Sequence, residues 1–263
     1  MKFDPTSIGK AQNNLPPRIV LSGEPKAGKT TFAAKAPNPL FIPIVGEEGC
    51  DGIIDEQGNA VDVHSTPVVQ SYNQLVEVLE WLATGEHDYK TVVIDSLSTA
   101  ERMIWEDLCK ADGSKSIELV AGGYGKGYTM TLERFRNITH LISQLREKRK
   151  MIAILISHVT PRALTDAESN EQYDAFDLSL NKKVTALFQQ WADFMVFASK
   201  SYYITEDNKR VEQDMNKLVV HGKAHLPIGG RGITKLMPKE VELTWDSFYK
   251  AVKQAKTQNK EGK

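Results

Sequence analysis

The chain has 263 residues, of which 41% are hydrophobic and 25% charged, and its formal net charge is −1. This composition is typical of a globular protein, so disorder is excluded as the default, and the balanced charge gives no whole-chain sign of binding to nucleic acid or membranes. Two cysteines are too few for a disulfide framework, and no apolar run is long enough to cross a membrane. We therefore expect a cytoplasmic protein with no membrane partner.

The first half of the chain alternates between short apolar runs and helix-like segments. Residues 1–17 lack periodicity and are interpreted as an N-terminal arm. In chain order, we predict strands over 18–22, 40–44, 61–64 and 91–94, and helices beginning at Lys29 and spanning 71–83 and 98–110.

The second half contains two long polar stretches, 111–128 and 160–179, which we predict to be loops. Around them we predict helices over 130–148, 182–190 and 245–256, strands over 151–156 and 194–198, hairpins over 201–221 and a polar tail over 257–263. Strands that alternate with helices, and central strands that are solidly apolar, favour an α/β fold. We predict one domain over 18–256, a mostly parallel sheet flanked by helices, with antiparallel hairpin strands added at one edge.

A phosphate-binding pattern, G-x-x-x-x-G-K-[ST], occupies residues 23–30 between a predicted strand and a predicted helix. Glycines allow main-chain N–H groups to turn toward an anion, and the positive end of the following helix points at the same place. Lys29 would reach the β- and γ-phosphates of a nucleotide, the Thr30 hydroxyl would bind Mg²⁺ and Thr31 would contact the α-phosphate. The alternative is a chance match in a turn rich in Gly and Lys. The predicted nucleotide-binding residues are Gly23, Glu24, Pro25, Lys26, Ala27, Gly28, Lys29, Thr30 and Thr31.

Asp95 follows a buried strand and is the natural second metal ligand of this pattern. Carboxyl ends of parallel strands meet at the ligand-binding edge of an open α/β sheet. A carboxylate there can hold Mg²⁺ from the side opposite Thr30. The alternative role for Asp95 is to begin a turn and cap the next helix.

Three further side chains are expected at the same sheet edge. Glu47 and Glu48 follow the second strand, and either could orient the water that attacks the γ-phosphate; as adjacent acids at a turn they could equally be plain surface residues. His158 follows the strand over 151–156, where it could sense the γ-phosphate or simply cap the strand end.

The two polar stretches also carry side chains suited to single-stranded nucleic acid, which is bound by cations along a path and by aromatic faces. The first contains Lys115, Tyr124 and Lys126 among glycines, and the second contains Arg162 together with several acids. Those acids argue against a strong grip on a phosphate backbone in the second stretch. Two flexible, solvated loops are the alternative interpretation.

The combination of motifs resembles the RecA-like core of P-loop ATPases, most closely the short RecA-core ATPases of bacteriophages and prophages described as single-strand annealing or recombination proteins. The resemblance covers roughly residues 18–250. The segments that carry it are 23–37, 88–98, 123–128, 154–158 and 191–194.

This resemblance implies ATP and Mg²⁺ as cofactors, single-stranded DNA as a partner and, for a phage protein, the host cytosol as location. It implies that the glutamate after the second strand is the catalytic acid, best matched by Glu47, and that His158 senses the γ-phosphate. It also implies that residues 111–128 and 160–179 are the DNA loops. Such proteins form rings or filaments in which a neighbouring subunit supplies a cation, for which Lys223 and Arg231 are candidates.

Two other functions compete with a recombination ATPase. One is a nucleotide-switched loader or scaffold whose partner is a replicative helicase or a single-strand binding protein. The other is a phosphotransferase that uses the same loop on a small acceptor, although the sequence shows no arginine cluster or acceptor-binding lid that favours it. Salt-sensitive binding to oligonucleotides would separate the first function from these two.

Overall fold

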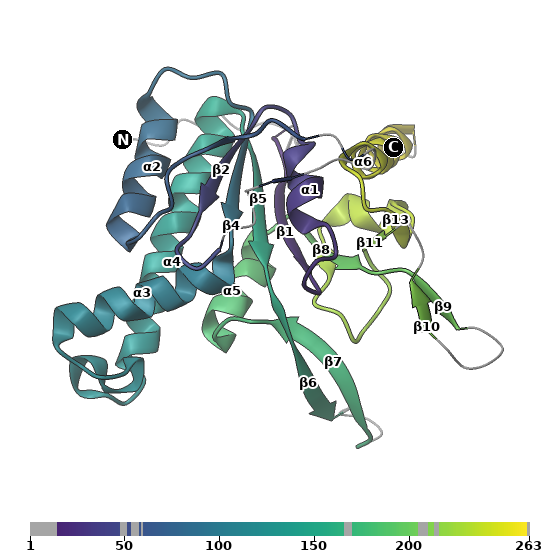
Figure 1. Cartoon of the computed structure of the whole chain (residues 1–263). Coiled ribbons are helices and arrows are strands. Elements are labelled where there is room, and N and C mark those ends of the chain that lie inside the picture. Colours follow the sequence, from purple (N-terminus) through teal and green to yellow (C-terminus); the bar gives the residue numbers. More distant parts are fainter. Residues whose placement is uncertain are drawn as a thin grey trace, which may run out of the picture.

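The computed structural model describes residues 15–47, 52–53, 58, 60–165, 170–204, 210–212 and 216–261. Its centre is a nine-stranded mixed sheet with helices packed on both faces (Figure 1). This arrangement confirms the predicted α/β class. None of the described helices is long and apolar enough to span a bilayer.

The centre of the sheet consists of parallel strands in the order β8-β1-β5-β4-β2, with β3 added in parallel beside β2. The register places Ser22 opposite Ser157, and Pro43 opposite Asp95, so the carboxyl ends of these strands form one edge. The strands are β1 (Arg18–Gly23), β2 (Pro39–Pro43), β3 (His64–Ser65), β4 (Thr91–Asp95), β5 (Ile152–Ser157) and β8 (Phe194–Ser199).

Antiparallel strands extend the sheet beyond β8, as the sequence predicts. The strands β11 (Lys217–Val219) and β12 (Gly229–Gly230) both pair with β8, and β13 (Glu240–Glu242) pairs with β11. A separate hairpin is formed by β9 (Tyr202–Ile204) and β10 (Arg210–Glu212).

The two faces of the sheet carry separate hydrophobic cores because side chains alternate along each strand. Val20 contributes to the core under α2–α5, whereas its neighbours Ile19 and Leu21 contribute to the core under α1 and α6. The helices are α1 (Lys29–Ala34), α2 (Tyr72–Thr84), α3 (Leu97–Asp112), α4 (Lys126–Gln144), α5 (Lys182–Trp191) and α6 (Trp245–Glu261), with the short segments η2 (Ile117–Gly122), η3 (Leu145–Arg149) and η4 (Gly232–Leu236).

Both predicted loops are largely structured, and those two predictions are wrong. In the first, η2 buries Ile117 and Val120, and α4 begins at Lys126, earlier than expected. In the second, β6 (Val159–Thr165) and β7 (Gln172–Leu178) pair along their whole length. This β6–β7 hairpin projects beyond the carboxyl edge of the sheet (Figure 1). Its residues 166–169 lie outside the described residues.

Other boundaries differ slightly from expectation. The strand predicted at 61–64 is β3 at His64–Ser65, and the closing helix runs to Glu261 rather than ending at residue 256, so much of the predicted polar tail is helical. Of the predicted N-terminal arm, residues 1–14 lie outside the described residues.

Candidate active site

The phosphate-binding pattern lies between β1 and α1, where two glycines are required by the backbone itself. Gly28 has a φ of 96°, which side chains rarely allow. Gly23 has a φ of 151°, and a Cβ built there would lie 2.3 Å from the carbonyl oxygen of Ala198 in β8. The loop therefore packs directly on the neighbouring strand, and its main chain is left bare for a ligand.

The Lys29 ammonium is folded over this loop. Its Nζ donates to the carbonyl oxygens of Gly23 at 2.9 Å and Glu24 at 2.8 Å. Burial lowers the pKa of Lys29, although the negative charges of Asp95, Glu47 and Glu24 partly offset this. An ammonium that is desolvated among neutral acceptors gains from an added anion. This local chemistry fits a phosphate group at the loop.

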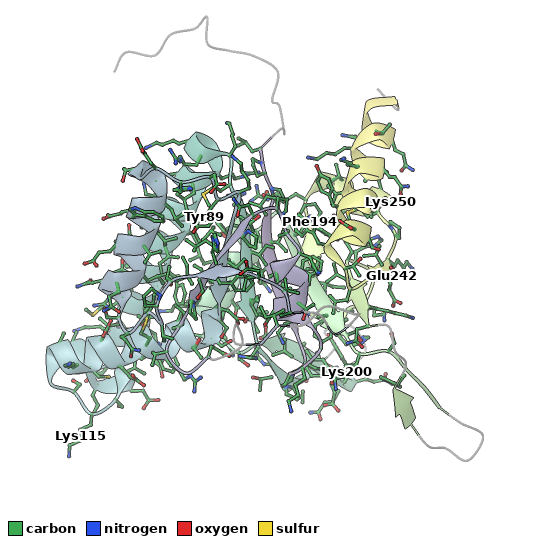
Figure 2. The ribbon with its side chains drawn as sticks, turned by 45° about the horizontal axis from the view of Figure 1, so that its top comes forward. Tyr89, Lys115, Phe194, Lys200, Glu242 and Lys250 are labelled. Atoms are coloured by element: carbon green, nitrogen blue, oxygen red, sulfur yellow. The ribbon has the colours of Figure 1, made fainter. Side chains whose placement is uncertain are left out.

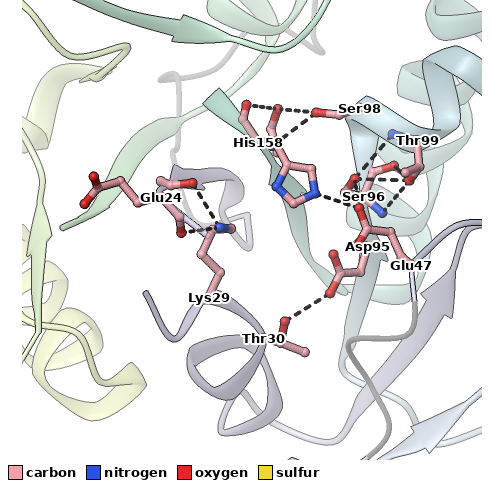
Figure 3. A network of polar contacts seen from close by, with 11 residues as sticks. Glu24, Lys29, Thr30, Glu47, Asp95, Ser96, Ser98, Thr99 and His158 are labelled. Atoms are coloured by element: carbon pink, nitrogen blue, oxygen red, sulfur yellow. Dashed lines mark hydrogen bonds and ion pairs between the residues drawn. The ribbon is translucent and has the colours of Figure 1, made fainter. Parts of the chain in front are cut away.

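Thr30 and Asp95 meet across the same edge, with Thr30 Oγ1 donating to Asp95 Oδ2 at 3.1 Å (Figure 3). Asp95 is almost fully buried, and burial raises its pKa to about 6, reinforced by the charge of Glu47. Two oxygen ligands bound side by side to Mg²⁺ at about 2.1 Å also lie about 3 Å apart. The pair therefore fits Mg²⁺ in both chemistry and spacing.

Glu47 makes two hydrogen bonds, and both use the same carboxylate oxygen. His158 Nε2 donates to Glu47 Oε1 at 2.6 Å, and Ser96 Oγ donates to it at 3.0 Å (Figure 3). Burial alone would raise the pKa of Glu47, but the hydrogen bond and charge of His158, with help from Ser96 and Arg102, hold that pKa below its usual value. Glu47 is therefore an ionised carboxylate whose other oxygen, Oε2, makes no hydrogen bond within the described part of the chain.

The start of α3 joins this cluster, and sequence reasoning missed its two serines. Ser96 is the N-cap of α3, in a capping box with Thr99. Ser98 Oγ accepts from the backbone N–H of His158 at 3.1 Å and contacts Ser157 Oγ at 3.3 Å. The available signal was the run Asp95-Ser-Leu-Ser98, in which hydroxyls follow a strand-end acid directly. Ser96 thus holds the side chain of Glu47, and Ser98 holds the backbone of His158.

The structure brings together most of the predicted catalytic and nucleotide-binding residues. Lys29, Thr30, Glu47, Asp95 and His158 lie at one edge of the sheet (Figure 3). Pro25 and Lys26 are exposed on the loop, Ala27 is buried beneath it, and Thr31 is half-buried in α1. Glu48 lies outside the described residues, so the choice between Glu47 and Glu48 rests on the contacts of Glu47 alone.

The predicted DNA contacts lie at two projecting parts of the molecule. Lys115, Tyr124 and Lys126 belong to the α3–α4 lobe, which we define as residues 109–128, and Lys115 lies at its tip (Figure 2). Tyr124 is 100% exposed, while Lys126 Nζ donates to the carbonyl oxygen of Ala121 at 3.1 Å. Arg162 lies on the β6–β7 hairpin, where it forms an ion pair with Asp177 at 2.9 Å. Part of its charge is therefore already satisfied.

The two candidate cations for a neighbouring subunit lie far apart in the fold. Lys223 pairs with Glu240 of β13 at 2.6 Å. Arg231 lies at the amino edge of the sheet, where its guanidinium donates to the carbonyl oxygen of Gln190 and approaches Asp193. Their assignment to a neighbour's site stays a prediction.

A cleft of about 940 Å³ opens beside His158, between α3, the start of α5 and the base of the β6–β7 hairpin. Its walls include the cations Arg102, Arg162, Lys182 and Lys183, with Trp105 on the α3 side. Neither Trp105 nor the α5 lysines had been predicted as site residues. The signal for Lys182 and Lys183 was their place at the start of a predicted helix that follows a predicted DNA loop.

A parallel sheet with this loop after its first strand, and with an acid at the end of β4, defines a P-loop nucleotide-binding protein. The sequence profile of the AAA domain family matches residues 15–225. The chain therefore belongs to the AAA domain family, a family of the P-loop ATPase type whose members generally use ATP and Mg²⁺. A search of the curated proteins found no match to this chain.

Proposed function

We propose that this protein is a Mg²⁺-dependent ATPase of the RecA type that acts on single-stranded DNA, in the recombination or annealing reactions of a phage. The observation that carries the hydrolytic part is the pair of hydrogen bonds that His158 and Ser96 donate to Glu47 Oε1. It holds an ionised carboxylate beside the Lys29, Thr30 and Asp95 cluster with one oxygen left over.

The residues of the chain divide the work of hydrolysis. Lys29 neutralises charge on the β- and γ-phosphates, and Thr30 with Asp95 holds the metal. Glu47 Oε2 orients the attacking water and accepts its proton. Mg²⁺, when bound, neutralises charge that develops on the phosphate oxygens. His158 is hydrogen-bonded to Glu47 and directly precedes β6. In this proposal it senses the γ-phosphate and passes the change on to the β6–β7 hairpin.

Single-stranded DNA is the ligand that best suits the cleft beside His158. Cations on three elements line it, and Trp105 offers an aromatic face, which is the combination that sequence-tolerant binding of a single strand requires. The α3–α4 lobe adds the fully exposed ring of Tyr124 and the cation of Lys115. A strand that runs from the lobe to the cleft would end beside His158.

The decisive experiment measures ATP turnover of the full chain alone, with duplex DNA and with single-stranded DNA. We expect slow turnover alone and a clear rise with single strands only. Lys29→Ala should abolish turnover and leave the fold intact, because Lys29 acts mainly on charge in the transition state. Unchanged turnover in Lys29→Ala would refute the site, whereas no stimulation and no oligonucleotide binding at low salt would remove the DNA role.

A second function, that of a nucleotide-switched loader, is favoured by the apolar exposure of the α3–α4 lobe. Leu119 is 57% exposed on the same lobe as Tyr124, and such exposed apolar side chains suit a protein partner as well as a base. The partner would be a replicative helicase or a single-strand binding protein. Binding to oligonucleotides whose affinity falls steeply between about 50 mM and about 200 mM salt would favour DNA over this alternative.

A further inference from the structure

A small apolar cavity lies at the amino edge of the sheet, far from the phosphate-binding loop. Its walls are formed by Ile152, Phe194, Ile233, Trp245, Phe248 and Val252. Figure 2 shows Phe194 between the sheet and α6, with Lys250 on the outer side of that helix. No residue of the chain's own ATP site lines this cavity, although Arg231, a candidate cation for a neighbouring subunit, does.

The size of the cavity limits what it can hold. Its volume is about 60 Å³. A single water occupies about 10–15 Å³ on this measure, so the space suits roughly four to six water-sized groups. The side chains of Leu and Met have four heavy atoms each and match that room, whereas the indole ring of Trp, with nine heavy atoms, is too large.

The rim of the cavity is cationic. Arg146, Arg231 and Lys256 line it, and Asp193 is the carboxylate among its lining residues. That carboxylate is already engaged: Arg18 binds both of its oxygens, Arg146 binds Oδ2 at 3.1 Å and Arg231 approaches Oδ1 at 3.9 Å. Three guanidinium groups therefore share one acid, and Lys256 adds a fourth cation.

Arg146 lies close to two other guanidinium groups, and its side chain is only 11% exposed. Burial and the neighbouring Arg18 and Arg231 lower the pKa of Arg146, and the opposing effects of Asp193 and Glu147 do not restore it. A further carboxylate at the rim would relieve this repulsion. The cavity therefore combines an apolar hole of the size of one aliphatic side chain with a rim whose cations outnumber its one carboxylate, Asp193.

We propose that this cavity is a docking site for an acidic peptide segment of a partner protein, which inserts one Leu- or Met-sized side chain and places its carboxylates on Arg146, Arg231 and Lys256. The chain's own residues 1–14 precede Leu15, another lining residue, but they contain Lys2 and Lys10 against a single acid, Asp4. Their charge does not complement the rim.

The test uses the full chain and fluorescence anisotropy with a labelled peptide in which Asp and Gly alternate around one central Leu. Companion peptides carry Ala, Met or Trp at the centre, or Lys in place of every Asp. We expect the Leu and Met peptides to bind at least about tenfold more tightly than the Ala, Trp and Lys peptides. Affinity should fall as salt rises, because part of it is electrostatic.

Two variants test the rim against a matched control. Lys256→Glu and Arg231→Glu should each weaken the Leu peptide by about tenfold or more, while Lys250→Glu, on the outer side of α6, should change it less than about twofold. Circular dichroism establishes that the variants are folded. Equal binding of all peptides, no binding, or binding that survives both rim variants would overturn the proposal. Tighter binding by a peptide of residues 1–14 would also overturn it, by assigning the cavity to the chain's own arm.

Discussion

The Glu47 carboxylate accepts both of its hydrogen bonds at Oε1, and Oε2 is left for the attacking water. This arrangement makes Glu47→Gln an informative variant. Gln in place of Glu47 keeps a carbonyl oxygen for His158 and Ser96 but cannot accept a proton from water. We expect Glu47→Gln to bind ATP normally and to lower turnover by about 10²–10⁴, the usual contribution of a general base. Nucleotide binding by calorimetry and steady-state turnover measure the two effects separately.

The control for this variant is Glu106→Gln, an exposed position on α3. It should leave turnover unchanged. Full activity in Glu47→Gln would show that another group orients the water, and Glu48→Gln would then be the next variant. A loss of ATP binding in Glu47→Gln would mean that the carboxylate supports the loop rather than the chemistry.

Glu101 links α3 to the start of α5. Its carboxylate is 3% exposed and accepts from the backbone N–H of Asn181, at 3.1 Å to Oε1 and 2.9 Å to Oε2. Burial raises the pKa of Glu101 to about 7, and the bond from Asn181 only partly opposes this. The carboxyl group therefore ties the junction between the hairpin and α5 to the helix that begins at the active site.

This pKa predicts how stability depends on pH. The folded protein holds the Glu101 proton more tightly than the unfolded chain does. The contribution of Glu101 to stability is therefore complete below the pKa of Glu101 in the unfolded chain, and it is lost as the pH rises toward about 7. Asp95 acts in the same direction at lower pH. Between about pH 6 and about pH 8.5 we expect the free energy of unfolding to fall by about 1 kcal/mol more in the native chain than in Glu101→Gln. Urea unfolding across this range measures it, and parallel curves would contradict it.

The packing of β1 on β8 gives a prediction about the phosphate-binding loop. In Gly23→Ala the new Cβ would lie 2.3 Å from a backbone oxygen of β8, in addition to the strain of a φ of 151°. Gly113→Ala is the matched control, because its φ is 75° and nothing lies within 4 Å. We expect the control to cost about 1–2 kcal/mol. Gly23→Ala should cost clearly more or fail to fold, and equal urea midpoints would contradict the close contact.

The elements that sequence reasoning found and missed differ in how much apolar surface they bury. The strands over 91–94 and 151–156 are solid apolar runs, so their place in the sheet could be predicted. In the β6–β7 hairpin only Ala175 and Leu178 are buried, both in β7, so its residues lack the alternation that marks a half-buried strand. In η2 only Ile117 and Val120 are buried, too few to form a pattern.

The same reasoning applies to the site. Lys29, Thr30 and Asp95 belong to local patterns whose spacing is set by one loop or one strand end, so they could be placed from the sequence. The bond between Glu47 and His158 joins residues 111 positions apart, and it depends on the register of β2, β4 and β5. Trp105 and the α5 lysines line one cleft only because α3, the base of the β6–β7 hairpin and the start of α5 meet beside His158.

Assembly is the remaining question for the whole molecule, because a cation from a neighbouring subunit typically adds about 10³–10⁵ to the rate of phosphoryl transfer. We expect turnover per subunit to rise steeply with protein concentration if assembly completes the site. A head-to-tail contact would also allow one subunit to supply the loop and the next to supply the cation. Lys223→Ala and Arg231→Ala identify which of the two candidates acts in this way.

Complementation between variants makes this prediction sharp. Lys29→Ala lacks the loop lysine but keeps the cation that reaches the neighbour. The variant that removes this cation, Lys223→Ala or Arg231→Ala, keeps the loop lysine. Each should be inactive alone, and an equal mixture should regain activity at about a quarter of the subunit boundaries, those that pair an intact loop with an intact cation. Size-exclusion chromatography with light scattering establishes that the mixed subunits assemble. If both cation variants keep full turnover alone, neither Lys223 nor Arg231 reaches a neighbour's γ-phosphate, and a mixture that assembles but stays inactive would place the cation within the same subunit as the loop.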